Sequence, residues 1–348
     1  MTDLRATAAA AAATPRIRIL AAFAAVYVLW GSTYLAMRYA DESLPPFLMA
    51  GTRFLVAGAL LYGWLRLRGA ARPSRVHWRS ALIVGALLLV GGNGIVAWSE
   101  LVLPSSLAAL LISTVPIWMA LLDWLRPGGR RTSRAALLGL ALGFAGVFLL
   151  IGPDALAAHS PHGSPSGFIL LVVPLAALSW AAGSLYSRSA KMPDLPLLGS
   201  GMEMLAGGAL LLVLAVVTGE PAQLHLQAVS PRSLLAVAYL IIFGSLVGFT
   251  CYTWLLRVTT PARAGTYAYV NPVVAVFLGW AFDSEPLTLR TLIAAAIIIA
   301  GVVVITTFHS HSAAPSRKPE RQAESSPSSP ALPSALDEGV KPRISVRD

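Results

Sequence analysis

Two charged residues lie well inside apolar segments of the chain. Arg53 follows Pro46 by seven residues, and Glu203 follows Pro196 by seven, in two stretches of similar sequence. A charge at the centre of a bilayer costs roughly 2.5–3.5 kcal/mol on insertion scales, so each residue needs a partner or water. At ~1.5 Å per helical residue, each lies ~10 Å from the start of its helix. One hypothesis is that both line a cavity for a charged or zwitterionic solute, with Glu203 carrying a coupling proton. The alternative is a structural ion pair, or side chains that snorkel along a neighbouring helix.

Polar and aromatic side chains also interrupt three other apolar segments. Hydroxyl and amide groups inside a membrane helix indicate a polar cavity, because lipid offers them no hydrogen bonds. Tyrosine also occurs in the aromatic belts at membrane interfaces, but these runs lie within their segments. Together with Arg53 and Glu203, the residues that we expect to bind a substrate are Trp30, Ser32, Thr33, Tyr34, Asn93, Trp98, Tyr267, Tyr269 and Asn271.

Glycine and proline residues lie close to these polar groups. The run from Gly91 to Gly94 surrounds Asn93 with glycines, which favour close helix packing and also let a backbone approach a ligand. Pro116 and Pro272 each remove a backbone donor, and we expect both to break or hinge a helix. Glu100 lies at the end of an apolar segment, where a solvated interfacial carboxylate is expected.

The sequence offers no arrangement for catalysis or for holding a metal ion or cofactor. All six histidines lie in connections or in the C-terminal tail, and Cys251 is the only cysteine. A phosphate-binding Gly-Lys loop is missing, which argues against a pump driven by ATP. We therefore predict a protein that is not an enzyme and has no catalytic residues, no metal site and no cofactor.

Composition places the chain in a membrane. Hydrophobic residues make up 56% of it and charged residues only 12%, about half the usual charged share of a soluble domain. The charges fall between apolar runs that are long enough for a helix to cross a ~30 Å hydrocarbon core. We predict an all-α membrane protein with ten spans at residues 18–38, 46–65, 80–99, 104–125, 133–152, 166–187, 196–217, 233–254, 262–282 and 288–308.

The distribution of basic residues predicts the orientation of these spans. Of the 26 Lys and Arg residues, 22 fall on one side, three on the other, and Arg53 lies within a span. Positively charged loops stay in the cytoplasm, so both termini are expected there, in the inner membrane. This role accounts for the net charge of +10 without a nucleic-acid partner.

The two halves of the chain resemble each other. Trp30–Arg38 aligns with Trp180–Arg188 at an offset of 150, and the segment from Pro46 aligns with that from Pro196 at the same offset. Arg79-Ser80 and Gly91 match Arg232-Ser233 and Gly244, Pro116 matches Pro272, and Ala145 matches Ala300. Five spans is an odd number, so two such halves insert with opposite orientation. Inverted repeats are typical of secondary transporters, with the substrate site between the halves.

These segments together resemble the EamA family of the drug/metabolite transporter superfamily, specifically its YedA-like exporters. The resemblance rests on LWGSTY from Leu29, PPFLMAGTRFL from Pro45 and GGNG from Gly91, followed by SWAAGSLY from Ser179, EMLAGG from Glu203 and TYAYVNPVVAV from Thr266. It covers about residues 17–308. It implies ten helices in two inverted repeats around a central cavity, and export of small metabolites or toxic analogues. The Ser/Pro-rich tail departs from the compact family pattern.

We therefore expect a secondary transporter that exports small metabolites or drug-like solutes, with amino-acid-like compounds among the candidates and a proton or ion gradient as a driving force. The alternative is an importer or exchanger of sugar-linked or phosphorylated solutes. Such solutes would favour several intramembrane Lys or Arg residues, whereas only Arg53 is present. The partners expected are the solute and the bilayer. The sequence predicts a leader at 1–16, repeats at 17–152 and 166–308, a periplasmic linker at 153–165 and a disordered cytoplasmic tail at 309–348.

Overall fold

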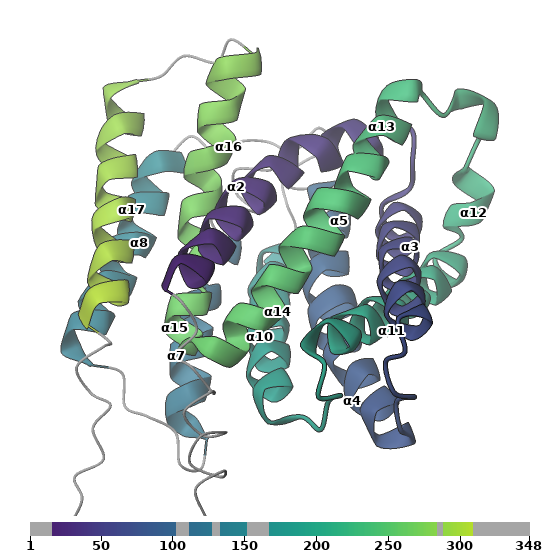
Figure 1. Ribbon diagram of the computed structural model, residues 1–348. Helices are drawn as coiled ribbons and strands as arrows, with labels where there is room; N and C mark the ends of the chain where they lie inside the picture. Colours follow the sequence, from purple (N-terminus) through teal and green to yellow (C-terminus); the bar gives the residue numbers. More distant parts are fainter. Residues whose placement is uncertain (1–15, 102–110, 127–132, 152–166, 284–287, 309–348) are drawn as a thin grey trace, which may run out of the picture. The chain divides into compact units, whose positions relative to one another are not determined.

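The computed structural model describes residues 16–101, 111–126, 133–151, 167–283 and 288–308, and the regular elements in these ranges are helices joined by turns and short connections. No strand occurs within these ranges. The helices of the first half are α2 (Arg16–Asp41), α3 (Pro46–Leu67), α4 (Arg75–Gly85), η1 (Ala86–Gly94), α5 (Ile95–Glu100), α7 (Val115–Leu125) and α8 (Arg134–Ile151) (Figure 1). The predicted leader up to residue 15, the linker and the tail lie outside the described ranges.

The second half also begins with two long helices, and it contains several short elements. Its helices are α10 (Gly167–Ser189), α11 (Pro196–Val217), α12 (Glu220–Gln223), η2 (Leu226–Ala228), α13 (Pro231–Tyr239), η3 (Leu240–Phe249), α14 (Thr250–Val258), α15 (Pro261–Ala264), α16 (Tyr267–Asp283) and α17 (Leu289–Phe308). Each of the ten predicted spans overlaps at least one of these helices.

Several of the described helices are long and apolar enough to cross a bilayer, as judged by length and composition. Six segments meet this criterion: Arg16–Asp41, Pro46–Leu67, Arg75–Ser99, Pro196–Val217, Pro231–Val258 and Leu289–Thr307. Two shorter apolar helices, Val115–Leu125 and Arg134–Leu150, accompany them. The segments agree with the predicted all-α membrane architecture.

Proline and glycine fix the ends of α3 and α11 at equivalent positions. Each helix begins at a proline, Pro46 or Pro196, whose missing N–H would have no partner in the first helical turn anyway. After each helix the chain turns at a glycine with a left-handed backbone, Gly69 with φ 88° and Gly219 with φ 77°. A residue without Cβ adopts this conformation without strain, so the two helices end at corresponding points.

Two π-helical segments interrupt long helices at corresponding places in the two halves. They are η1, between α4 and α5, and η3, between α13 and α14. A π-helical turn misaligns some backbone carbonyl groups with the N–H groups of the helix. Side chains from neighbouring helices donate hydrogen bonds to these carbonyls. Ser179 Oγ donates to Leu87 O in η1 at 2.8 Å, and Trp30 Nε1 donates to Gly244 O in η3 at 3.0 Å. Thus α10 is tied to η1, and α2 to η3.

Glycines let α3 and α11 pack with their backbones in contact. A Cβ on Gly58 would lie 2.6 Å from Leu205 N, and a Cβ on Gly208 would lie 2.6 Å from Leu55 N. The order of these contacts along the two helices is opposite, so α3 and α11 run antiparallel. Gly58 and Gly208 are 150 residues apart, and so are Leu55 and Leu205. Each contact is therefore the equivalent of the other in the opposite half.

The pair α8 and α17, side by side in Figure 1, repeats this arrangement. A Cβ on Gly146 would lie 3.0 Å from Ile298 N, and a Cβ on Gly301 would lie 2.7 Å from Gly143 N. These contacts exchange at an offset of 155, and the two helices are again antiparallel. In both pairs, the helices at equivalent places in the two halves are direct neighbours.

The close approach of α3 and α11 leads to a testable prediction. Gly58→Ala should destabilise the fold by about 1–3 kcal/mol, because the added methyl group meets backbone that can move only with its helix. Gly63→Ala on the same helix is the matched control, since no atom lies within 4 Å of its Cβ position. Thermal unfolding in detergent micelles, followed by size-exclusion chromatography, measures both. Equal midpoints for the two variants would contradict the packing described.

Candidate functional site

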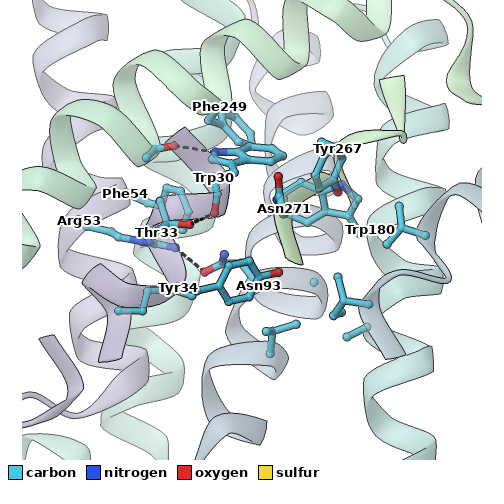
Figure 2. Close-up of a pocket in the computed structure, with 17 residues that line it drawn as sticks. Trp30, Thr33, Tyr34, Arg53, Phe54, Asn93, Trp180, Phe249, Tyr267 and Asn271 are labelled. Atoms are coloured by element: carbon cyan, nitrogen blue, oxygen red, sulfur yellow. Dashed lines mark hydrogen bonds between the residues drawn. The ribbon is translucent and has the colours of Figure 1, made fainter. Parts of the chain in front are cut away.

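A cavity of about 90 Å³ lies between helices of the first and second halves. From the first half, α2, α3, η1 and α5 line it, together with Ile112 and Val115; from the second half, α10, η3 and α16 do so. Seven of the residues expected from the sequence lie on its wall: Trp30, Thr33, Tyr34, Arg53, Asn93, Tyr267 and Asn271 (Figure 2). Residues distant in sequence therefore meet around one space.

Arg53 and Asn93 form the polar side of the cavity. Arg53 Nη2 donates to Asn93 Oδ1 at 2.7 Å, and the guanidinium lies 4.5 Å from the ring centre of Phe54 (Figure 2). Arg53 is 3% exposed and is the only charged residue among the described residues that line the cavity. The cavity is therefore electropositive at this point and suited to an anionic group of a solute.

Asn271 supplies a second polar contact. It is 3% exposed, and its Oδ1 has no hydrogen-bond partner within the described part of the chain. A buried amide oxygen without a donor costs free energy that a bound N–H or O–H group would recover. Arg53 and Asn271 thus offer opposite hydrogen-bonding character to one solute.

Four aromatic rings form a cluster beside these polar groups. The ring of Trp30 lies 5.6 Å from that of Trp180, 5.0 Å from that of Tyr252 and 4.8 Å from that of Tyr267, between centres. Aromatic pairs at these separations stabilise each other by about 0.5–1.5 kcal/mol beyond the area they bury. Trp30 and Trp180 come from equivalent positions in the two halves. The cluster gives the cavity a rigid apolar wall.

Tyr252 connects this cluster by hydrogen bonds, and sequence reasoning did not identify it. Its hydroxyl accepts from Trp180 Nε1 at 2.9 Å and lies 2.6 Å from Ser184 Oγ. It is fully buried on α14, which the sequence presents as an ordinary apolar segment. Trp180, Phe54 and Phe249 also line the cavity and were not among the predicted binding residues. The repeat provided a signal for Trp180, since it aligns with Trp30.

The remaining predicted binding residues are placed outside the cavity lining. Ser32 Oγ lies 2.6 Å from Tyr239 Oη and donates to Leu29 O. Tyr269 is fully buried against α8, where its hydroxyl donates to Leu140 O at 3.3 Å. Trp98 packs against the largest apolar cluster of the core. Glu203 is buried on α11, and Arg257 is the cation that acts on its carboxyl group electrostatically.

The two prolines expected at helix breaks occupy different settings. Pro116 lies in the first turn of α7, where proline fits without loss of a hydrogen bond. Pro272 lies inside α16, directly after Asn271 on the cavity wall. Pro272 thus prevents one backbone hydrogen bond within a helix that lines the cavity.

Comparison with known proteins identifies relatives along most of the chain. The model of the EamA-like transporter family matches residues 17–152 and again residues 167–307. The inner membrane transporter YedA of Escherichia coli (strain K12) is 39% identical over 290 residues, which cover 83% of this chain and 90% of the relative. The transporter YoaV of Bacillus subtilis (strain 168) is 24% identical over 298 residues, covering 83% of this chain and 97% of the relative. A crystal structure with 23% identity superposes with a TM-score of 0.67, covering 84% of this chain and 98% of the other, and supports the fold.

Proposed function

The chain belongs to the EamA-like transporter family, and from this premise we propose that it is a secondary-active exporter of small organic solutes that works by alternating access. The family and the relatives' names indicate a membrane transporter rather than an enzyme. The observation that carries the proposal is the cavity, whose wall combines helices of both halves with one buried cation.

Two similar halves of opposite orientation are one architecture that allows alternating access, and the helix packing supports this arrangement. The pairs α3–α11 and α8–α17 join equivalent helices, and each pair runs antiparallel through contacts that exchange between the halves. A two-fold relation of this kind lets the halves exchange conformations. One exchange opens the cavity to one side of the membrane, and the reverse exchange opens it to the other.

The solute that fits the cavity best is a small zwitterion with an apolar or aromatic body, such as an amino acid. Its carboxylate would contact Arg53, its ammonium group would donate to Asn271 Oδ1, and its side chain would pack on Trp30 and Trp180. Hydrogen bonds to charged groups contribute about 1.5–3 kcal/mol each, which is enough to select such a solute over an uncharged one.

Export from cells tests the proposal directly. Cells that overproduce the protein should enrich zwitterionic metabolites in the medium relative to cells with an empty vector, as measured by mass spectrometry. Proteoliposomes should then exchange labelled for unlabelled L-phenylalanine without ATP. A requirement for ATP inside the vesicles, in the absence of any gradient, would contradict the secondary-carrier mechanism.

The orientation inferred from the basic residues is a further prediction. A fluorescent protein fused after Phe308 should be bright, and alkaline phosphatase at the same point inactive, because both report a cytoplasmic C-terminus. A phosphatase fusion in the 284–287 connection, which the ten-span topology places in the periplasm, should be active and serves as the control. Phosphatase activity after Phe308 would refute ten spans with both termini inside.

A further inference from the structure

Two glutamates are buried in the described part of the chain, and their surroundings differ. Glu220 is 5% exposed, and its carboxylate accepts from Phe47 N at 3.1 Å and from Leu48 N at 2.7 Å, at the N-terminus of α3. Glu203 is 2% exposed, yet its Oε2 has no hydrogen-bond partner among the described residues. One carboxylate is thus solvated by backbone donors, whereas the other lacks such donors at one oxygen.

The position of Glu203 brings it close to the end of α14. One turn before Glu203, a Cβ on Gly199 would lie 3.3 Å from Arg257 Nη2, and Ser200 Oγ lies 2.6 Å from Thr253 Oγ1. Arg257 is exposed in the last turn of α14. Glu203 therefore lies about one helical turn deeper than a solvent-exposed cation.

Besides Arg257, other ionisable groups lie on the elements around α11. Those on the elements packed against α11 are Arg53, Tyr62 and Arg66 of α3, Arg75, His77 and Arg79 of α4, Glu220 of α12, and Cys251 and Tyr252 of α14. Of these, Arg53 lines the cavity and Glu220 caps α3. The electrostatic influence on Glu203 comes from Arg257, without an ion pair between the two within 4.0 Å.

A carboxylate in such a place is costly, and a neutral carboxyl group is not. An ionised group that is removed from water without donors loses solvation worth several kcal/mol, which binding a proton avoids. Replacement of a neutral carboxyl group by an amide preserves shape and charge. By contrast, the two oxygens of Glu220 accept backbone N–H groups at the N-terminus of α3, where the helix dipole stabilises negative charge.

We propose that Glu203 is an internal proton-binding site that couples solute export to proton entry. The coupling to export rests on the proposed function, whereas the proton site rests on the burial of Glu203. In the conformation described, the carboxyl group holds a proton taken from water. When the halves exchange conformation, the proton passes to water on the cytoplasmic side, and the carboxylate is solvated there. The exchange that carries the solute out returns the carboxylate to the outer side, where it takes a proton from water.

Infrared spectroscopy of the purified protein in lipid vesicles tests the proton site without any solute. At neutral pH, the wild-type spectrum minus that of Glu203→Gln should contain the carbonyl band of one protonated carboxyl group, and the band should shift in D₂O. Glu220→Gln is the matched control and should remove none of this absorbance. Because both substitutions are isosteric, thermal unfolding establishes that each variant is folded.

Two results would overturn the proton site. One is a Glu203→Gln spectrum that keeps all of the wild-type absorbance from protonated carboxyl groups. The other is a band that fails to shift in D₂O, since a site that exchanges no proton cannot couple transport.

Coupling is tested with L-phenylalanine as the probe in proteoliposomes. Glu203→Gln should keep solute exchange within about twofold of wild type while losing at least tenfold in accumulation driven by a pH gradient. Accumulation equal to wild type would refute the coupling role. Failure of the wild type to exchange phenylalanine would instead count against the proposed solute class, and the infrared difference would still decide the proton site.

Discussion

Replacement of Arg53 by alanine is expected to lower the rate of solute export about 10- to 100-fold while the protein level stays near that of wild type. The guanidinium is the only charge among the described residues on the cavity wall, so a carboxylate bound there loses its charged donor. One such hydrogen bond contributes about 1.5–3 kcal/mol, which corresponds to this range of rates. L-Phenylalanine exchange in proteoliposomes, at matched protein content, measures the effect.

The control for Arg53→Ala is Arg68→Ala, which removes an exposed arginine just after the same helix. It should exchange the solute like wild type. Arg53→Lys should fall between the two, because lysine keeps the charge but not the planar guanidinium whose Nη2 donates to Asn93 Oδ1. If Arg53→Ala transports normally, the claim that this residue binds the solute is wrong. If it lowers the amount of folded protein without lowering activity per molecule, Arg53 has a structural role.

Truncation of Trp180 to alanine is expected to destabilise the protein by about 3–5 kcal/mol, the usual cost of removing a buried aromatic side chain. Trp180 packs edge-on against Trp30, donates to the Tyr252 hydroxyl, and lies so close to η1 that a Cβ on Gly92 would be 2.6 Å from its ring. Its loss therefore opens a void where α10, α14 and η1 meet. The midpoint of thermal unfolding in detergent micelles measures the change.

Trp64→Ala is the matched control for this prediction. Trp64 lies near the end of α3 with half of its surface exposed, so its truncation should change stability little. Trp180→Phe keeps a ring but removes the N–H donor, and it should cost about 1 kcal/mol. Equal unfolding midpoints for Trp180→Ala and Trp64→Ala would show that the aromatic cluster does not stabilise the junction between the halves.

The sequence alone was sufficient to predict the elements and the broad class of the protein. Apolar runs of about 20 residues can satisfy their backbone groups in lipid only as helices, so length and composition predict the α-helical membrane fold. Arg53 could be identified because a charge in such a run is costly and therefore noticeable. The family was equally accessible, since the order of motifs along the chain carries it.

Only the tertiary structure decided which of the predicted residues share one cavity. Tyr267 and Tyr269 belong to one motif, but residues two apart on a helix point ~200° away from each other. Tyr267 therefore lines the cavity, while Tyr269 packs on α8. Helical spacing shows that the two differ but not which one faces the solute, because that depends on which neighbour packs on each face.

Packing against neighbouring helices also explains why Arg53 and Glu203 have different surroundings. They hold equivalent positions in the two halves, which predicts similar depth. The structure places Arg53 on the cavity wall, whereas Glu203 lies under the electrostatic influence of Arg257, away from the cavity lining. Depth along a helix follows from residue number at a fixed rise, but the direction of a side chain relative to other helices follows from packing between segments distant in sequence.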